Sequence, residues 1–267
     1  MHPVLLRWGN YTLHAYSTLV CLGILLGIAY VQWRGRQDNW DGLRILDGAL
    51  WLWTGGLIGA RTAYVISNWT DYATHPFTAL VVWSSWDGGL VFQGGLLGGL
   101  LALWVYSSRI GMNLVDWLDR AAPAVSLAQG IGWVGALLHG ANYGIVMRTA
   151  FSLWLPDLYG VYGPRIPTQL LAALLDLGLF VALHRLSTRR LQPGMLAWIY
   201  LWGNGLGHLF IEFARADEAP YWGMLRVTQW FELVEVLGAS VLMLRVWHQV
   251  VVCRKSRRRV APSLRKE

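Results

Sequence analysis

Long, nearly uncharged apolar runs constrain the fold of this chain more than any other feature of its sequence. Hydrophobic residues occupy 55% of its 267 positions and charged residues only 14%, whereas a soluble domain carries about 25% charged residues. A run of about 20 apolar residues is long enough for a helix to cross a bilayer. Seven segments reach or approach that length, at residues 14–33, 46–66, 88–107, 121–140, 168–184, 194–213 and 228–250. The sequence therefore predicts an all-α polytopic membrane protein with about seven transmembrane helices.

The distribution of arginine and lysine predicts how these segments are oriented. Fifteen of the 22 basic residues follow the first, third, fifth or seventh segment, and five lie in the connections on the opposite side. Cytoplasmic loops carry an excess of basic residues, so we expect the N-terminus outside and the C-terminus in the cytoplasm. An odd number of spans, such as seven, satisfies that arrangement.

The chain is expected to form a single membrane domain over residues 1–267, because no linker or low-complexity segment divides it. Its final residues, 254–267, form a predicted basic cytoplasmic tail close to anionic lipid headgroups. The net charge of +7 is explained by membrane orientation, and we expect no nucleic-acid partner.

Ionisable side chains inside the apolar segments are the first candidates for function, because a charge in the bilayer interior is costly. Arg61 lies in the second segment with Tyr64 three residues further on, so both occupy one face of a helix. Two roles for Arg61 stay open here. One is an ion pair with Asp87 or Glu212, and the other is a contact with a substrate.

The sixth segment carries a second polar face. His208 and Glu212 are four residues apart, and Arg215 follows Glu212 by three. An acid between a histidine and an arginine is suited either to holding a phosphate group or to an ion pair that only stabilises the fold. Structural, paired or solvated roles are the simplest expectation for His139, Asp176, Glu232 and Glu235.

Paired glycines flank a carboxylate and an amide around the start of the third segment. The stretch from Trp86 to Gly99 places Asp87 and Gln93 beside glycine pairs at 88–89, 94–95 and 98–99. Another helix or a ligand can approach such backbone closely, because glycine has no side chain. The sequence contains no Walker A loop, GxSxG or HExxH motif, and its two cysteines lack metal-ligand spacing. We therefore expect no cofactor and no metal.

Six short motifs follow one another along most of the chain. They are His14-Ala15-Tyr16, Gly59 to Tyr64, Trp86 to Gly95, Gly132 to Gly144, Arg165 to Leu170, and Gly207 to Arg215. In this order they resemble the signatures of the bacterial prolipoprotein diacylglyceryl transferases. The resemblance implies a multi-pass protein of the bacterial plasma (inner) membrane. It also implies transfer of a diacylglyceryl group from phosphatidylglycerol to the lipobox cysteine of a prelipoprotein signal peptide, with glycerol phosphate as the leaving group.

Such a transfer needs a base for the thiol, cationic donors for the phosphate and a lateral opening for the lipid. On the motif positions, the catalytic candidates are Tyr16, Gln93, His139 and His208. The candidates for contact with phospholipid or substrate are Arg61, Tyr64, Asp87, Gly88, Gly89, Gly94, Gly95, Trp133, Arg165, Gln169, Glu212 and Arg215.

Several motif positions depart from the family pattern. Gln93 stands where the family has histidine, and Trp133 and His208 stand where it has arginine. Further replacements occur at Ala136, His139, Ala141, Ile166 and Ala172. An amide is not a general base near pH 7.

Two readings of these departures stay open. One is a divergent transferase in which His139 and His208 take over the base and phosphate roles. The other is a catalytically degenerate paralogue that binds phospholipid or a lipoprotein or membrane partner without transfer. A small-solute transporter is a third class, and it would predict an internal repeat.

Overall fold

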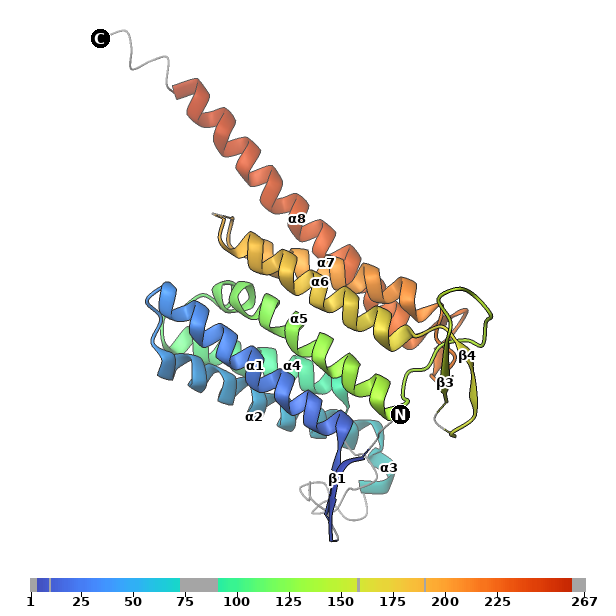
Figure 1. Ribbon diagram of the computed structural model, residues 1–267. Helices are drawn as coiled ribbons and strands as arrows, with labels where there is room; N and C mark the ends of the chain where they lie inside the picture. Colours follow the sequence, from blue (N-terminus) through green and yellow to red (C-terminus); the bar gives the residue numbers. More distant parts are fainter. Residues whose placement is uncertain (1–3, 10, 73–90, 158, 190, 261–267) are drawn as a thin grey trace, which may run out of the picture. The chain divides into compact units, whose positions relative to one another are not determined.

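The computed structural model describes residues 4–9, 11–72, 91–157, 159–189 and 191–260. Within these residues the fold is mostly helical (Figure 1). The helices are α1 (Ala15–Gln37), α2 (Gly42–Ser67), α3 (Trp69–Tyr72), α4 (Phe92–Arg109), α5 (Leu114–His139), α6 (Thr168–Ser187), α7 (Met195–Glu212) and α8 (Val227–Val260). All of them except α3 coincide with one of the predicted apolar segments.

Four of the described helices are long and apolar enough to cross a membrane, by length and composition. They are α1, α5, α6 and the part of α8 from Val227 to His248. These helices agree with the expectation of a membrane protein. The first residues of the predicted third segment, 88–90, lie outside the described residues.

Three short antiparallel hairpins, which the sequence reasoning did not predict, accompany the helices. Their strands are β1 (Val4–Trp8) with β2 (Tyr11–His14), β3 (Leu153–Pro156) with β4 (Tyr162–Arg165), and β5 (Tyr221–Trp222) with β6 (Leu225–Arg226). Gly160 lies between β3 and β4 with a φ of 81°, and Gly223 lies between β5 and β6 with a φ of 66°. Glycine adopts this left-handed backbone without steric cost, which favours tight turns at both places.

The chain divides into two compact units. Unit 1 contains Met1–Tyr30 and Leu118–Glu267, and unit 2 contains Val31–Trp117. In unit 1, α7 packs against both α6 and α8 (Figure 1). Small residues bring α1 against α5 in the same unit, because a Cβ on Gly27 would lie 3.2 Å from the carbonyl oxygen of Ala124.

Two polar side chains explain where α5 and α7 begin. The Asn113 side chain accepts a hydrogen bond from the backbone N–H of Val115 at 3.1 Å, which caps α5 seven residues before the predicted apolar segment starts. The carboxylate of Asp119 on α5 accepts bonds from the backbone N–H groups of Gly194 at 2.6 Å and Ala197 at 2.9 Å. A carboxylate at this position also complements the positive end of the α7 dipole.

Unit 2 is built on a close contact between α2 and α4. Four glycines form it, two from each helix: Gly55, Gly59, Gly94 and Gly98. A Cβ on Gly98 would lie 2.8 Å from the Cα of Gly59, closer than real Cβ contacts. At the other end of α2, Ile45, Leu103, Tyr106 and Trp117 form a buried apolar cluster. The two helices therefore meet backbone to backbone, as small residues allow in membrane helices.

Candidate functional site

The predicted site residues are divided between the two units. Unit 2 holds Arg61, Tyr64, Gln93, Gly94 and Gly95, and unit 1 holds Tyr16, Trp133, His139, Arg165, Gln169, His208, Glu212 and Arg215. Asp87, Gly88 and Gly89 lie outside the described residues.

Arg61 is buried in unit 2 between two aromatic rings. Arg61 is only 7% exposed. Its Cζ lies 5.7 Å from the ring centroid of Tyr64 and 5.5 Å from that of Tyr72. The two tyrosine rings meet edge to face at 6.3 Å. Cations are attracted to aromatic faces at such distances. The three-residue spacing of Arg61 and Tyr64 predicted the first of these two contacts. The contact with Tyr72 was not predicted, because Tyr72 lies in α3, where the sequence shows no helical periodicity.

The glycine pair at 94–95 faces α2. A Cβ on Gly94 would lie 2.5 Å from the carbonyl oxygen of Gly59. Of the two partners that the glycines could admit, a helix or a ligand, the one that approaches Gly94 is therefore the helix α2. Gly95 instead lines an apolar hollow of about 530 Å³ between α2 and α4. Gln93, in the first turn of α4, is exposed.

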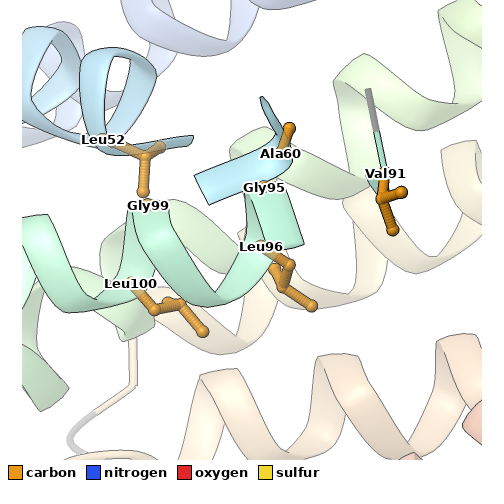
Figure 2. Close-up of a pocket in the computed structure, with 7 residues that line it drawn as sticks. All are labelled: Leu52, Ala60, Val91, Gly95, Leu96, Gly99 and Leu100. Carbon is orange, nitrogen blue, oxygen red and sulfur yellow. The ribbon is translucent and has the colours of Figure 1, made fainter. Parts of the chain in front are cut away.

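That hollow is a feature the sequence reasoning did not predict. Figure 2 shows Leu52 and Ala60 of α2 beside Gly99 and Gly95 of α4. Val91, Leu96 and Leu100 complete the lining. The backbone N–H of Val91 donates to the carbonyl oxygen of Ala60 at 3.1 Å, which ties the start of α4 to α2. All seven lining residues are apolar or glycine, so the hollow suits a hydrocarbon chain better than a polar ligand.

In unit 1, His208 is held by a carboxylate and by an aromatic ring. Its Nε2 lies 3.2 Å from Oδ1 and 3.4 Å from Oδ2 of Asp176 on α6. Its ring stacks on Trp133 of α5, with centroids 5.4 Å apart and an interplanar angle of 24°. Trp133 and His208 both stand where the resemblance to the family implies arginine, and their rings contact each other. Their partner Asp176, expected to be structural, thus belongs to the same cluster.

Further polar side chains lie along the neighbouring helices of unit 1. The hydroxyl of Tyr200 donates to Oε1 of Gln129 at 2.6 Å. Asn204 Nδ2 donates to Oε2 of Glu235 at 3.4 Å, so Glu235 is paired, one of its two expected states. Within the part of the chain that the structure describes, the buried atoms Asn204 Oδ1 and Glu232 Oε2 have no hydrogen-bond partner.

Glu212 and Arg215 belong to a network of four charged residues at the end of α7. Arg215 binds Glu212 Oε2 at 2.6 Å and Asp217 Oδ2 at 2.6 Å. Arg226 completes it, 3.2 Å from Asp217 Oδ1 and 3.5 Å from Glu212 Oε1. Arg215 also donates to Oδ1 of Asn142 at 2.9 Å. The sequence left open whether Glu212 and Arg215 hold a phosphate group or form a structural ion pair, and this geometry matches the structural ion pair.

The electrostatics of this network follow from its geometry. Burial alone would raise the pKa of Asp217, but hydrogen bonds and charge from Arg215 and Arg226 outweigh it, and the pKa lies below its usual value. Burial would likewise lower the pKa of Arg215, but its bonds to Asp217 and Glu212 raise it overall. Asp217 and Arg215 therefore stay charged near neutral pH.

Arg165 and Gln169 secure the long connection between α5 and α6. Arg165 donates to Asp157 Oδ2 at 2.9 Å, and its guanidinium lies 4.8 Å from the ring centroid of Tyr143. Gln169 Nε2 donates to the carbonyl oxygen of Ala141 at 2.7 Å. Both side chains thus contact residues of this connection, Arg165 from β4 and Gln169 from α6, and their predicted contact with substrate stays a prediction.

Tyr16 and His139 lie close together in unit 1. Their ring centroids are 6.0 Å apart, and both residues are exposed. The contact joins the start of α1 to the end of α5, where the backbone of Tyr16 also approaches Gly135. The structure thus brings two of the four catalytic candidates together and places a third, His208, on α7 of the same unit.

The apolar helices and the buried charged clusters define a mostly helical membrane protein with polar sites inside its helical units. A family model described as prolipoprotein diacylglyceryl transferase matches residues 3–245. The chain therefore belongs to the prolipoprotein diacylglyceryl transferase family, as the six motifs suggested.

Individual relatives agree along nearly the whole chain. A phosphatidylglycerol–prolipoprotein diacylglyceryl transferase of Streptococcus agalactiae serotype V is 31% identical over 253 residues, covering 91% of this chain and 95% of the relative. A protein with the same name from Gloeobacter violaceus is 30% identical over 267 residues, covering 97% and 96%. Another from Limosilactobacillus reuteri is 28% identical over 255 residues, covering 91% and 90%.

Proposed function

We propose that this protein transfers a diacylglyceryl group from phosphatidylglycerol to the lipobox cysteine of a prelipoprotein. The match to transferases of this name along nearly the entire chain is the observation that carries the proposal. The proposed setting is the bacterial plasma membrane, crossed seven times, with the N-terminus outside and the C-terminus cytoplasmic. In the reaction the cysteine sulfur attacks a glycerol carbon, a C–S bond forms, the C–O bond to phosphate breaks, and glycerol phosphate leaves.

Unit 2 supplies groups that fit a phospholipid. Arg61 provides a guanidinium, which suits a phosphodiester because guanidinium donors match phosphate oxygens. The apolar hollow begins at the neighbouring residue, Ala60, and is lined by hydrocarbon. We propose that Arg61 and Tyr64 contact the headgroup while one acyl chain lies in the hollow.

A lipid-binding protein without transferase activity is the second candidate function. Two observations favour it. Arg215 is already bonded to Glu212, Asp217 and Asn142, so it is occupied within the protein. Gln93 lacks a proton-accepting group for the thiol. A protein of this kind would bind phosphatidylglycerol and leave the peptide unmodified.

One experiment separates the two candidates. Purified protein in phosphatidylglycerol nanodiscs is incubated with a lipobox peptide, and the peptide mass is followed. The transferase reading predicts a diacylglyceryl thioether on the cysteine and none on a Cys→Ser peptide. Unmodified peptide together with co-purified phosphatidylglycerol would refute transfer and support the binder.

The variant Arg61→Ala tests the lipid site in the same assay. We expect it to reduce both product formation and co-purified phosphatidylglycerol, because a buried cation is removed. Arg148→Ala is the matched control, since Arg148 is an exposed loop arginine and carries the same charge. Equal lipid occupancy in the two variants would count against Arg61 as the headgroup contact.

A further inference from the structure

The carboxylate of Asp176 has no access to solvent. Asp176 is 0% exposed, and its own carbonyl oxygen accepts a hydrogen bond from Ser126 Oγ at 2.7 Å, which fixes the α6 backbone against α5. Both carboxylate oxygens face Nε2 of His208. A buried carboxylate is destabilising unless it is paired with a donor. The donors described for Asp176 are His208 and the side chain of Trp133.

This pairing determines the state of the imidazole. When Nε2 carries the hydrogen that points at Asp176, Nδ1 carries the lone pair. The ring cannot turn freely, because it stacks on Trp133 and the side chain is only 11% exposed. Close packing of α7 on α6 adds to this restraint, since a Cβ on Gly207 would lie 2.6 Å from Cδ1 of Leu175. The stacking and the packing restrain the imidazole, and in the tautomer with hydrogen on Nε2 the nitrogen that can accept a proton is Nδ1.

We propose that Asp176 is a positioning residue that makes His208 the base for the substrate thiol. This inference rests on the transferase function proposed above. Nδ1 of His208 takes the thiol proton, and the sulfur forms its bond to the glycerol carbon as the C–O bond breaks and glycerol phosphate leaves. The imidazolium that results faces the Asp176 carboxylate, which stabilises it as in other Asp–His pairs. The pair thus supplies the proton acceptor that Gln93 lacks.

Other charged groups near His208 have to be counted in any pH experiment. Asp176 faces it from α6, and Glu235 of α8 interacts with it electrostatically. One turn further along α7, Glu212 is paired with Arg215 and Arg226. From α5 the neighbouring group is the uncharged Trp133. The variant Glu235→Gln therefore serves to measure the contribution of the second carboxylate.

The test compares Asp176→Asn with Asp119→Asn across a pH series of the thioether-forming reaction. Asp119 is a matched control, because it also contributes a carboxylate that supports α7, where it accepts hydrogen bonds from the backbone N–H groups of Gly194 and Ala197. Asp176→Asn is expected to lower kcat by about 10²- to 10⁴-fold, with KM for phosphatidylglycerol within about twofold of its original value. The acid limb of the pH profile should move to lower pH, because the imidazolium loses its carboxylate.

Asp176→Glu should restore part of the rate, and Asp119→Asn should leave the acid limb in place. A merely structural Asp176 would lower the amount of folded protein without moving that limb. An unshifted limb in Asp176→Asn, with kcat falling no further than in Asp119→Asn, would overturn the inference.

A second readout does not depend on turnover. Nitrogen NMR of ¹⁵N-histidine-labelled protein in micelles, with His208→Gln to assign the signal, reports which ring nitrogen carries the hydrogen. We expect a protonated Nε2 and an unprotonated Nδ1 in the original protein, and a mixture in Asp176→Asn. The same tautomer in both proteins would refute positioning by Asp176. A fixed tautomer in a protein that forms no thioether would instead refute the transferase function and the base role together.

Discussion

The glycine contact between α2 and α4 makes a sharp prediction about stability. In the variant Gly59→Ala, the new Cβ would lie 2.9 Å from Cα and 3.1 Å from N of Gly98, and closer still to the carbonyl oxygen of Gly94. These are backbone atoms of a helix and cannot turn aside as a side chain does. Ordinary carbon contacts begin at about 3.5 Å, so the helices would have to separate by roughly 0.6 Å or more.

The matched control is Gly56→Ala on the same helix, where the nearest atom to the new Cβ is the carbonyl oxygen of Gly95 at 3.4 Å. Replacing an interior helical glycine with alanine stabilises a helix by about 1 kcal/mol, and this gain is common to both variants. Overpacking costs about 1–3 kcal/mol, and it applies only to Gly59→Ala. The difference between the two free energies of unfolding therefore isolates the clash.

We expect Gly56→Ala to be slightly more stable than the original protein and Gly59→Ala to be less stable than Gly56→Ala by about 1–3 kcal/mol. The measurement is loss of helical circular dichroism during titration with sodium dodecyl sulfate in mixed micelles. Equal midpoints for the two variants would show that α2 and α4 do not meet through these glycines.

Two further predictions concern the polar contacts of unit 1. Asp119→Ala removes the acceptor for the N–H groups of Gly194 and Ala197 and should lower the free energy of unfolding by about 0.5–2 kcal/mol; a change within measurement error in the same titration would contradict the cap. Asp217→Asn should be less stable than the original protein at pH 7, and the difference should shrink in acid. The reason is that the pKa of Asp217 is lowered in the folded protein, so its stabilisation is complete above the unfolded value of about 3.9 and is lost as the pH falls through the folded value. Unfolding midpoints of the two proteins that stay parallel from pH 7 to pH 3 would be incompatible with that linkage.

The positions of the long helices were predictable because hydropathy acts over whole segments. The predicted segment 168–184 starts where α6 starts, and α1 and α7 agree with their segments to within a few residues. The start of α5 was not predictable in this way, since its first turns contain polar residues and its cap is the side chain of Asn113. The hairpins escaped prediction because strands of two to five residues are too short to show an alternating pattern.

The candidate site was predictable only where its partners lie within a turn of one another. Three-residue spacing predicted the contact of Arg61 with Tyr64 and the pairing of Glu212 with Arg215. The same reasoning placed His208 beside Glu212, whereas the imidazole bonds to Asp176, 32 residues away on another helix. Contacts between helices depend on their packing and rotation, which periodicity within one segment does not specify.

The stacking of Trp133 on His208 has a consequence for how this chain diverged from its relatives. The two rings occupy positions where the resemblance to the family implies arginine, and they are in contact with each other. Because the rings stack, a substitution at either position changes the surroundings of the other, and we expect the effects of the two substitutions to be non-additive. Members of the family that carry tryptophan at the first site are expected to carry a ring at the second, and sorting sequences by the pair should separate this branch from the rest.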